Sequence, residues 1–465
     1  MSIMEQNPPN AHTIRIPELC LVLLIGSSGA GKSTFAKRHF SATEILSSDF
    51  YRGVVADDEN SQDASSDAFE VLHLLTGKRL ARGLLTVIDA TNLKPEARAP
   101  FLRLARIHQV EPIAIVLDVG PEVCHAQNEH RADRVVGSWV VEHHAELVPA
   151  AIKALETERV RQVFVLRSRE EIDSVAIERL RLPVNMRDRH PPFDFVGDVH
   201  GCFEELMALL KKLGYVVDCQ EADDQGRQYA VTHPDNRTLV FVGDLVDRGP
   251  KVTEVLRLTM DMVDAGIALT VLGNHDDKLR RKLKGNDVYV THALAETLAQ
   301  LDKEPDAFRE RLEGFLERLA PHLVLDRGKI VVAHGGLKKE LHGRVTPRAR
   351  SFALYGDTSG EKDENGLPIR RNWAADYDGK AIVVYGHTPV EEPMWQNRTI
   401  NIDTGCVFGG KLTAFRYPER EIVCVAALEK YCEPKRAFLS GACGREETAE
   451  SDRPEEGPAT KPEGP

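Results

Sequence analysis

The chain has 465 residues, of which 42% are apolar and 28% charged, and its formal net charge is −12. This length exceeds one ordinary hydrophobic core and predicts two or three domains, and the composition is that of a globular protein. The acidic balance argues against a general nucleic-acid coat, because sequence-independent affinity comes from Lys and Arg neutralising phosphates; a locally basic groove stays open.

The cysteines and the apolar runs exclude further classes of protein. The eight cysteines are scattered without a CxxC pair, which indicates neither a zinc ribbon nor a disulfide framework. No apolar run approaches the ~20 residues of a membrane span, and the start MSIMEQNPPN lacks a signal-peptide pattern. We therefore expect a cytoplasmic protein with no membrane partner.

A phosphate-binding loop follows the first strand. Residues 1–16 are a polar lead-in, and residues 19–25 are apolar on both faces, as is typical of a buried parallel strand. The next residues match G-x-x-x-x-G-K-[ST] and precede a helical segment over 35–40. Such loops wrap phosphates with backbone N–H groups, while Lys32 reaches the β- and γ-phosphates and the Ser33 hydroxyl reaches Mg²⁺. The predicted site for ATP with Mg²⁺ consists of Gly26, Ser27, Ser28, Gly29, Ala30, Gly31, Lys32, Ser33 and Thr34.

Two acidic residues follow the next predicted strands. Asp49 comes after a short strand over 44–46, where its carboxylate can accept the proton of an attacking hydroxyl, as in phosphoryl transfer to alcohols. The alternative for Asp49 is a helix N-cap. Asp89 ends a strand over 84–88 and is either an outer-sphere partner of Mg²⁺ or a hydrogen-bonding group at the strand end.

Further strands over 113–117 and 163–166 complete a parallel α/β domain over residues 17–172. The helical segment after Pro121 places Arg131 and Arg134 on one face, three residues apart. Either these arginines close over the phosphates and stabilise the transferred group, or they form a solvated face. An arginine-dense, proline-containing linker is expected over residues 173–193.

Five apolar strands in the second half end in residues that bind metals. They cover residues 193–196, 238–242, 267–272, 330–333 and 381–385. Alternate residues of a strand share a face, and open α/β sheets build their sites at the carboxyl ends of strands. We therefore predict a site for two divalent ions, with six ligands: Asp198, His200, Asp244, Asn274, His334 and His387.

The predicted ligands indicate the chemistry of this site. Asp244 is the natural bridge between two ions, since a carboxylate has two oxygens. Mixed nitrogen and oxygen ligands favour Mn²⁺, Fe²⁺, Co²⁺, Ni²⁺ or Zn²⁺ over Ca²⁺ and Mg²⁺, and such a pair of ions suits hydrolysis of a phosphate ester. Next to the ligands, His275 can protonate the leaving oxygen, Asp247 can orient that imidazole and Arg248 can bind the phosphate oxygens. The alternative for these three residues is a structural role in salt bridges.

The metal domain is expected over residues 194–431, with a helical insertion over 293–320. Residues 432–465 are rich in Glu, Pro and Gly and poor in apolar residues. We expect them to form an acidic, disordered tail.

The motifs GDVHG, GDLVDRGP, GNHD, HGG and GHT, in this order, resemble the binuclear metallophosphoesterases, which include serine/threonine protein phosphatases and diadenosine tetraphosphate hydrolases. Together with the phosphate loop and the segments SSDFYRGVVADDEN, DATN, VFVLRS and NIDTGCVFGGKLTAFRYPE, residues 18–430 resemble the bacterial polynucleotide kinase-phosphatases that heal broken RNA. The resemblance implies an α/β fold class: a P-loop kinase-type parallel-sheet domain followed by a calcineurin-like, two-sheet metallophosphoesterase domain.

The resemblance also implies two activities. Lys32, Ser33 and Asp49 would transfer the γ-phosphate of ATP to a 5′-hydroxyl end, with Arg131 and Arg134 as lid arginines. The second site, with Mn²⁺, would remove 2′,3′-cyclic, 2′- or 3′-phosphates. The implied partners are nucleic-acid ends, RNA rather than DNA, and a homodimer is compatible with the sequence.

Two departures from the family pattern leave alternatives open. Gln127 replaces a phosphate-contacting lid arginine, and no ligase-like domain follows the phosphatase, so a separate ligase would seal the healed ends. A second hypothesis is a phosphatase of phosphoproteins or dinucleoside polyphosphates with an ATP-gated regulatory P-loop domain, which Gln127 and the acidic charge favour. A third is a non-catalytic scaffold that docks a ligase, which the complete set of metal ligands disfavours.

Overall fold

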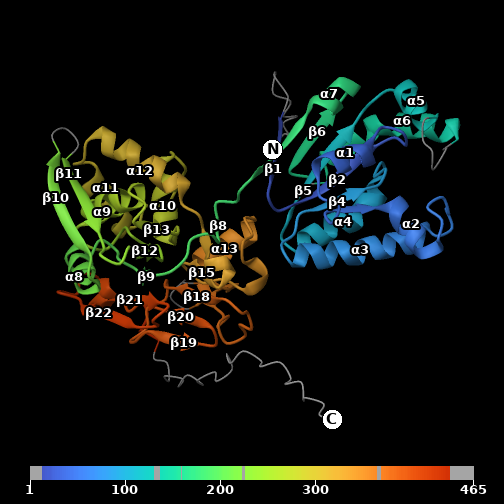
Figure 1. Cartoon of the computed structure of the whole chain (residues 1–465). Helices are drawn as coiled ribbons and strands as arrows, with labels where there is room; N and C mark the ends of the chain where they lie inside the picture. Colours follow the sequence, from blue (N-terminus) through green and yellow to red (C-terminus); the bar gives the residue numbers. More distant parts are fainter. Residues whose placement is uncertain (1–12, 130–136, 159, 223–225, 364–367, 440–465) are drawn as a thin grey trace, which may run out of the picture.

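The computed structural model describes residues 13–129, 137–158, 160–222, 226–363 and 368–439. Figure 1 shows two bodies, one built from the first part of the chain and one from the rest. In these described ranges no helix combines the length and the apolar character needed to cross a membrane.

A five-stranded parallel sheet in the order β3-β4-β2-β5-β6 forms the N-terminal domain. Its strands are β2 (Cys20–Gly26), β3 (Ile45–Ser47), β4 (Thr86–Asp89), β5 (Glu111–Leu117) and β6 (Gln162–Leu166). Its helices are α1 (Lys32–His39), α2 (Ser48–Ala56), α3 (Ser65–Ala81), α4 (Pro95–Ile107), α5 (Pro121–Glu129), α6 (Ser138–Leu155) and α7 (Arg169–Ser174). Strand β2 is buried along its whole length, because Val22 and Leu24 enter one apolar cluster and Leu21 and Leu23 another.

Two sheets form the C-terminal domain, in the orders β13-β12-β9-β21-β22 and β19-β20-β18-β15-β14-β8. The strands of the first are β9 (Phe193–Val196), β12 (Thr238–Phe241), β13 (Ala268–Thr270), β21 (Lys411–Tyr417) and β22 (Ile422–Ala426). Those of the second are β8 (Asn185–Met186), β14 (His322–Leu325), β15 (Ile330–Ala333), β18 (Ile382–Tyr385), β19 (Met394–Gln396) and β20 (Thr399–Asn401). The five predicted strands therefore form, with shorter bounds at some ends.

Helices cover the outer faces of this pair of sheets. They are α8 (Phe203–Leu213), α9 (Val252–Asp264), α10 (Asn274–Leu283), α11 (His292–Leu301), α12 (Asp306–Arg318) and α13 (Pro347–Tyr355). Between the sheets, Phe195 and Val240 pack in one cluster with Val332 and Val384. The second domain also has two hairpins: β10 (Val216–Ala222) with β11 (Gly226–Thr232), and β16 (Thr358–Lys362) with β17 (Pro368–Arg370). The predicted α/β fold class, with a parallel sheet first and two packed sheets second, is confirmed.

The segment expected as a linker pairs with strands of both domains. Strand β7 (Ala176–Leu180) runs parallel to β1 (Thr13–Pro17), which lies at the end of the expected lead-in. Strand β8 then joins the edge of the second sheet through β14. Both pairings are non-local, so a composition rich in Arg and Pro gave no signal for them.

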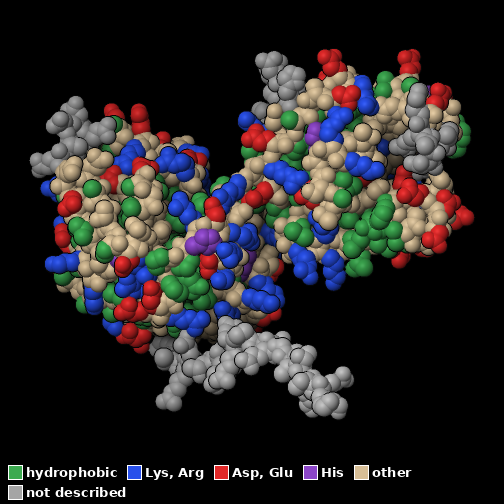
Figure 2. Space-filling model, viewed as in Figure 1, with side chains coloured by type: hydrophobic (Ala, Val, Ile, Leu, Met, Phe, Trp, Pro, Cys, Tyr) green, Lys and Arg blue, Asp and Glu red, His purple; other side chains and the backbone are tan. Residues whose placement is uncertain are grey.

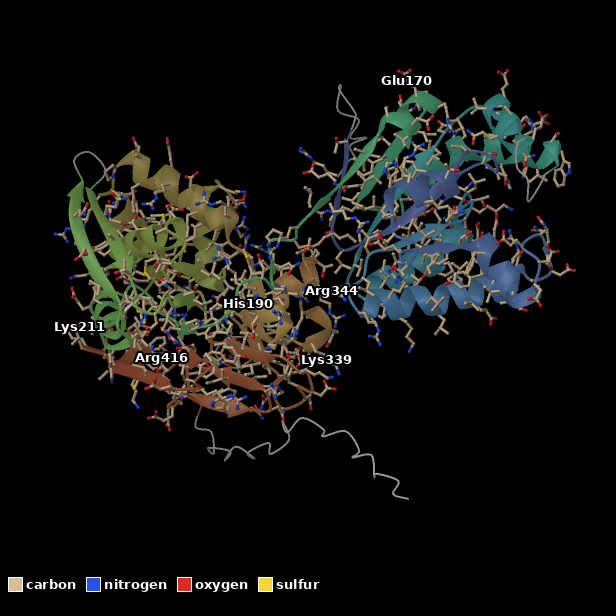
Figure 3. The ribbon with its side chains drawn as sticks, in the orientation of Figure 1. Glu170, His190, Lys211, Lys339, Arg344 and Arg416 are labelled. Carbon is tan, nitrogen blue, oxygen red and sulfur yellow. The ribbon has the colours of Figure 1, made fainter. Side chains whose placement is uncertain are left out.

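The two domains contact each other through side chains of the segment before α13. Arg344 Nη2 donates to Leu80 O near the end of α3 at 2.8 Å, and Thr346 Oγ1 donates to Gln109 Oε1 at 2.8 Å. Figure 3 shows Arg344 on the side of the second domain that faces α3. Figure 2 shows the domains as two rounded bodies that meet along part of their surfaces, with Lys and Arg side chains near the junction.

Candidate active sites

The phosphate-loop motif lies between the buried strand β2 and helix α1. Helix α1 begins at Lys32 after Gly31, whose φ is 90°. The Lys32 ammonium is buried and donates to Gly26 O at 3.0 Å and to Ser27 O at 2.8 Å. The first backbone N–H groups of a helix have no partner within the helix and favour anions. The loop thus has the geometry of an anion cradle at the carboxyl end of the central strand.

Close packing fixes the path of this loop. Gly29 has a φ of +84°, and a Cβ at this position would come 2.3 Å from Cys124 O of α5. A glycine is therefore required on both conformational and steric grounds. Behind the loop, Ser27 Oγ donates to Val141 O of α6 at 3.1 Å.

Asp49 and the phosphate loop both lie at the carboxyl ends of strands in the same parallel sheet. Its neighbour Ser47, at the end of β3, pairs with Asp89 on β4, and Asp89 also pairs with Leu24 on β2. The N-cap of α2 is Ser47 and Asp49 lies in the first turn, so the N-cap alternative for Asp49 is wrong.

The partner of Asp49, Arg52, was not predicted from the sequence. Arg52, one helical turn later, is buried, contacts the Asp49 carboxylate and donates through Nε to Glu59 O at 2.9 Å. The i, i+3 spacing of an acid and a base on a helix was the signal that could have identified this pair.

An arginine from α7 reaches the phosphate loop beside Gln127. In the amide orientation that satisfies both of its ends, Gln127 donates to Gly29 O at 2.8 Å and accepts from Arg169 Nη1. A Cβ on Gly31 would lie 3.5 Å from Arg169 Nη1. Arg169 thus brings a guanidinium near the loop from a different element, with its Nε paired to Asp173 at 2.8 Å. The predicted lid residues Arg131 and Arg134 lie outside the described residues.

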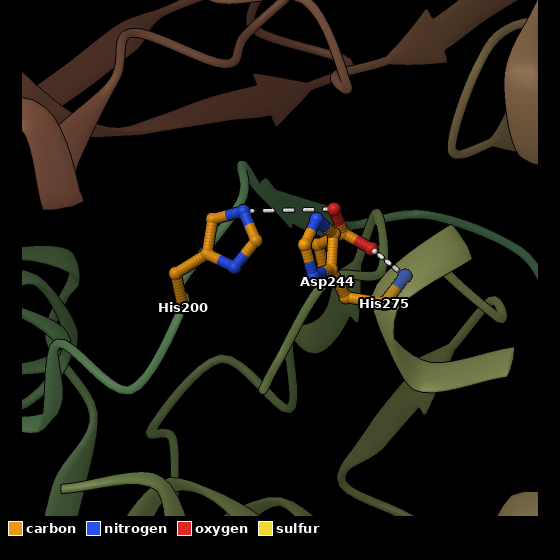
Figure 4. A group of neighbouring side chains, drawn as sticks. All are labelled: His200, Asp244 and His275. Atoms are coloured by element: carbon orange, nitrogen blue, oxygen red, sulfur yellow. Dashed lines mark hydrogen bonds and ion pairs between the residues drawn. The ribbon is translucent and has the colours of Figure 1, made fainter. Parts of the chain in front are cut away.

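The second predicted site assembles around Asp244, at the ends of the strands in the C-terminal domain. His334 Nε2 lies 3.3 Å from Asp244 Oδ2, 2.9 Å from Asn274 Oδ1 and 2.9 Å from His387 Nδ1. On the other side, His200 Nε2 lies 3.5 Å from Asp244 Oδ2 (Figure 4). Ligand atoms of His200, Asp244 and His275 lie within 4.8 Å of one another, as do those of Asp244, His334 and His387. Asp244 thus belongs to both groups, as a bridging carboxylate would.

Asp198 completes the set of buried ligand candidates. Its carboxylate accepts from His387 N, with Oδ2 at 3.2 Å. Burial, together with the negative charges of Asp403 and Asp244, raises the pKa of Asp198 well above its usual value. The structure therefore brings together all six predicted ligands, Asp198, His200, Asp244, Asn274, His334 and His387.

The donor atoms of this cluster fit divalent cations. His200 Nδ1 lies 2.7 Å from Val246 O, which directs Nε2 to Asp244. His387 Nε2 is buried without a hydrogen-bond partner among the described residues. Burial opposes ionisation of Asp244, but His334 and His275 outweigh it and hold its pKa well below the usual range. Imidazole nitrogens and carboxylate oxygens around a shared carboxylate suit transition ions.

Backbone conformations in the left-handed region occur repeatedly in these ligand loops. The φ angles are 45° at His200, 50° at Asp244, 71° at Asp247, 72° at Arg248 and 73° at His387. Non-glycine residues rarely adopt such conformations, which cluster at functional sites where the surrounding structure enforces them. The loops are therefore built to direct these side chains inward.

His275, Asp247 and Arg248 lie together beside the ligand cluster. His275 Nδ1 is 2.6 Å from Asp247 Oδ2, and Thr297 Oγ1 donates to Asp247 Oδ1 at 2.7 Å. Arg248 Nη1 and Nη2 donate to Nε2 of His200 at 2.6 Å and of His275 at 2.9 Å. An oriented imidazole and a guanidinium thus face the same point as the metal ligands.

Two buried carboxylates of the site were not assigned from the sequence. Asp276 accepts from Leu245 N and Gly273 N, both at 3.0 Å, and so joins two ligand loops. Asp403 is buried and accepts from Gly405 N at 3.0 Å, and burial contributes most to raising its pKa to about 6. The motifs that contain these residues, GNHD for Asp276 and NIDTG for Asp403, were the available signals.

A cavity of about 1060 Å³ opens beside the metal ligands. Its lining includes Asn274, His275 and His387 from the ligand loops and Arg248 next to them. A substrate phosphate entering this cavity would meet the predicted ligands directly.

Comparisons with known proteins match both halves of the chain. The calcineurin-like phosphoesterase profile matches residues 191–421, and an AAA domain profile matches residues 21–155. The chain is 46% identical over 247 residues to the bis(5′-nucleosyl)-tetraphosphatase PrpE (asymmetrical) of Anoxybacillus flavithermus, covering 52% of this chain and 97% of that protein. The same protein of Bacillus subtilis is 46% identical over 247 residues, covering 52% and 98%.

A solved serine/threonine phosphatase of Saccharomyces cerevisiae, with similarity to human phosphatase PP5, is also similar. It has a TM-score of 0.37 and is 16% identical, with coverage of 52% of this chain and 82% of that one.

Proposed function

We propose a function from one premise: the chain belongs to the calcineurin-like phosphoesterase family through residues 191–421. Its second domain is a phosphoesterase that uses divalent metal ions, and its first is a kinase-like P-loop domain. We propose that the fused chain heals broken RNA ends. The first domain phosphorylates 5′-hydroxyls, and the second removes 2′,3′-cyclic, 2′- or 3′-phosphates.

The observation that carries this proposal is Asp49 beside the phosphate loop, in contact with Arg52. A nucleotide-binding regulator needs no carboxylate there, whereas transfer to an alcohol needs a group that accepts its proton. In this mechanism the loop and Lys32 would hold the phosphates of ATP, the Ser33 hydroxyl would bind its Mg²⁺, and Asp49 would receive the proton of the 5′-hydroxyl.

In the second domain the six ligand candidates would hold two divalent ions, for which we propose Mn²⁺. Bound there, the ions lower the pKa of a water and polarise the phosphoryl group. Arg248 binds phosphate oxygens, and His275 delivers a proton to the leaving oxygen from Nε2. Asp247, 2.6 Å from His275 Nδ1, accepts from that nitrogen and so orients the ring with Nε2 toward the site.

A second candidate is the hydrolysis of dinucleoside polyphosphates, with the P-loop domain as an ATP-dependent regulator. The 46% identity to relatives named as asymmetrical bis(5′-nucleosyl)-tetraphosphatases, over 97% of the length of one, favours it. The two candidates share the same phosphoesterase site and differ in the role of the first domain.

Two assays test the proposal. The full chain is incubated with labelled ATP and a 5′-hydroxyl RNA, and separately with Mn²⁺ and an RNA that ends in a 2′,3′-cyclic phosphate. Lys32→Ala is expected to abolish labelling and spare phosphate release, and Asp198→Ala to do the reverse. A folded variant that loses both activities contradicts two independent sites.

Comparison substrates separate the two candidates. Diadenosine tetraphosphate hydrolysed far faster than RNA ends, with no labelling of any 5′-hydroxyl, would favour the second. Matched DNA ends test the proposed preference for RNA, and added ligase tests whether a separate enzyme seals the products. We also propose a cytoplasmic location, and a homodimer can be tested by light scattering.

A further inference from the structure

Residues 431–439 form one wall of the cavity beside the metal ligands. Tyr431 N donates to Val407 O at 3.1 Å, and Leu439 N donates to Pro389 O at 3.0 Å. The segment is thus fixed at both ends, and each attachment point follows a loop of the site. Its residues 432–439 belong to the phosphoesterase domain rather than to the acidic tail that composition predicts.

Aromatic packing holds the far end of this segment in place. The ring of Phe438 lies against that of Phe408, with centroids 6.1 Å apart. A Cβ at Gly405 would come 2.4 Å from Phe438 Cζ, so the ring sits directly on the loop that carries Asp403. The residues between the two attachments are therefore held across the cavity.

Cations of this wall face cations on the opposite side. Lys435 and Arg436 are exposed and line the cavity, as do Lys278 of α10 and Arg370 of β17. Burial lowers the pKa of Lys278, Asp247 counteracts this in part, and the nearby Lys435 lowers it further. The pKa of Arg370 is lowered by desolvation and by the nearby Arg436. Like charges therefore approach each other in two places around one cavity.

The polar partners of these cations leave positive charge available. Lys278 Nζ donates to Thr291 Oγ1 at 3.3 Å, and Arg370 Nη1 donates to Thr388 Oγ1 at 2.9 Å. Both acceptors are neutral hydroxyls. Asp363 pairs with Arg436 through Nε, at 3.0 Å, and through Nη2, and the carboxylates of Glu296 and Glu433 also line the cavity, so the cations that keep most of their charge are Lys278, Arg370 and Lys435. Converging cations of this kind are stabilised by a bound anion.

The positions of these cations relative to the metal ligands define what they can bind. Lys278 lies four residues after Asn274 on α10, which is about 6 Å along the helix axis. Thr388, the partner of Arg370, directly follows His387. The cations thus lie next to the metal ligands, just outside the point where the reacting phosphate would be held.

We infer that Lys435 and Arg436, together with Lys278 and Arg370, form a subsite for a second phosphate group of the substrate. This inference rests on the proposed phosphoesterase function and adds a substrate class to it. The preferred substrates carry a further phosphate next to the one that is cleaved, as RNA ends and dinucleoside polyphosphates both do. Orthophosphate and simple aryl monophosphates cannot use the subsite.

The test compares two inhibitors of p-nitrophenyl phosphate hydrolysis by the full chain, at fixed free Mn²⁺. Orthophosphate reaches the metal ligands alone, whereas tripolyphosphate also reaches the cations. The double variant Lys435→Ala/Arg436→Ala is expected to raise the inhibition constant of tripolyphosphate, relative to that of orthophosphate, by about 10-fold or more. The exposed Lys380, which precedes β18 and is outside the lining, provides the control Lys380→Ala, which should leave the ratio unchanged.

A charge-preserving variant guards against misfolding as the cause. Lys435→Arg/Arg436→Lys should keep the ratio within about 2-fold of the wild type, since charged hydrogen bonds remain available. The inferred subsite is wrong if the alanine variant leaves the ratio of the two inhibition constants unchanged, including the case in which both constants rise by the same factor.

Two substrates then identify the source of the second phosphate. A trinucleotide with a 3′-phosphate and diadenosine tetraphosphate are compared by kcat/KM in the wild type and the alanine variant. If the alanine variant has a lower kcat/KM than the wild type for the trinucleotide, the subsite binds RNA. If its kcat/KM is lower for diadenosine tetraphosphate, the subsite binds polyphosphates. If the wild type cleaves neither, the proposed substrates are wrong, while the inhibitor ratio still decides whether the subsite exists.

Discussion

At the level of single residues, His275 can act as a proton donor or as a metal ligand, and the structure gives a way to separate the two. Its Nδ1 is held by Asp247, while its Nε2 lies near Arg248 and within reach of the metal cluster. If His275 is the general acid, its loss matters most for a poor leaving group. We expect His275→Ala to lower kcat by about 10²–10⁴ for an alkyl phosphate and much less for p-nitrophenyl phosphate.

Metal content is the accompanying measurement for this variant. A general acid can be removed with both ions still bound, so the amount of Mn²⁺ per chain should match the wild type. Asp247→Asn, which disturbs the ring orientation, should show the same leaving-group pattern with a loss of about 10–100-fold. A parallel fall in Mn²⁺ content would instead identify His275 as a ligand.

A buried histidine that is not among the ligand candidates predicts how stability depends on pH. His322 is fully buried, accepts from Gly343 N at 3.0 Å, and has its pKa lowered to about 3, mainly by burial. The unfolded chain binds a proton at this residue near pH 6.5 and the folded chain does not. Its contribution to stability is therefore complete above about pH 6.5 and falls as the pH drops towards 3, by about 2 kcal/mol at pH 5.

The variant His322→Gln keeps an acceptor for Gly343 N but does not titrate. In urea unfolding, its loss of free energy between pH 7 and pH 5 should be about 2 kcal/mol smaller than that of the wild type. Equal losses in both proteins would show that the folded chain protonates this residue.

Residues within a dedicated motif were predictable from the sequence, whereas residues that act through them were not. The six ligand candidates each follow an apolar strand, so one rule found them all. Arg52, Asp276 and Asp403 instead hold other residues through hydrogen bonds. Such roles depend on which loops meet in space, and spacing along the chain does not specify that.

At the level of elements, the end of β18 shows how strand and ligand are coupled. A Cβ at Gly386 would come 2.1 Å from Asp198 Oδ1. We therefore expect Gly386→Ala to displace this carboxylate and weaken Mn²⁺ binding by about 10-fold or more, the scale seen when ligand orientation is disturbed. Gly120→Ala is the control, because a Cβ there meets nothing within 4 Å. Calorimetric titration with Mn²⁺ measures both, and equal affinities would contradict the coupling.

Elements with local signals were predicted well, and those that depend on distant partners were not. Strand β2 was recognisable because it is apolar on both faces, which reflects its burial between two layers. Strand β7 and the segment 432–439 have mostly polar or exposed side chains, and β1 has only two buried apolar residues, Ile14 and Ile16. They are ordered by hydrogen bonds to residues far away in the sequence, such as Leu439 with Pro389. No periodicity within those segments could reveal these partners.

At the level of the whole molecule, each domain has its own apolar core, so contacts between domains can be weakened without unfolding either. Arg344 Nη2 donates to Leu80 O in the last turn of α3, where the helix dipole favours a cation. A carboxylate at this position would face the same carbonyl groups and repel them. We expect Arg344→Glu to loosen the docking, seen as a larger radius of gyration in small-angle scattering and faster tryptic cleavage within residues 173–193.

The matched control is Arg348→Glu, which makes the same change of charge at an exposed position of α13. Hydrolysis of p-nitrophenyl phosphate should persist in both variants, because the metal ligands lie in loops away from Leu80 and Arg344. If Arg344→Glu has the same radius of gyration and the same rate of tryptic cleavage as the control, the domains are held together by other contacts. If instead it loses phosphoesterase activity along with docking, the second site depends on the position of the first domain, and the two sites are not independent.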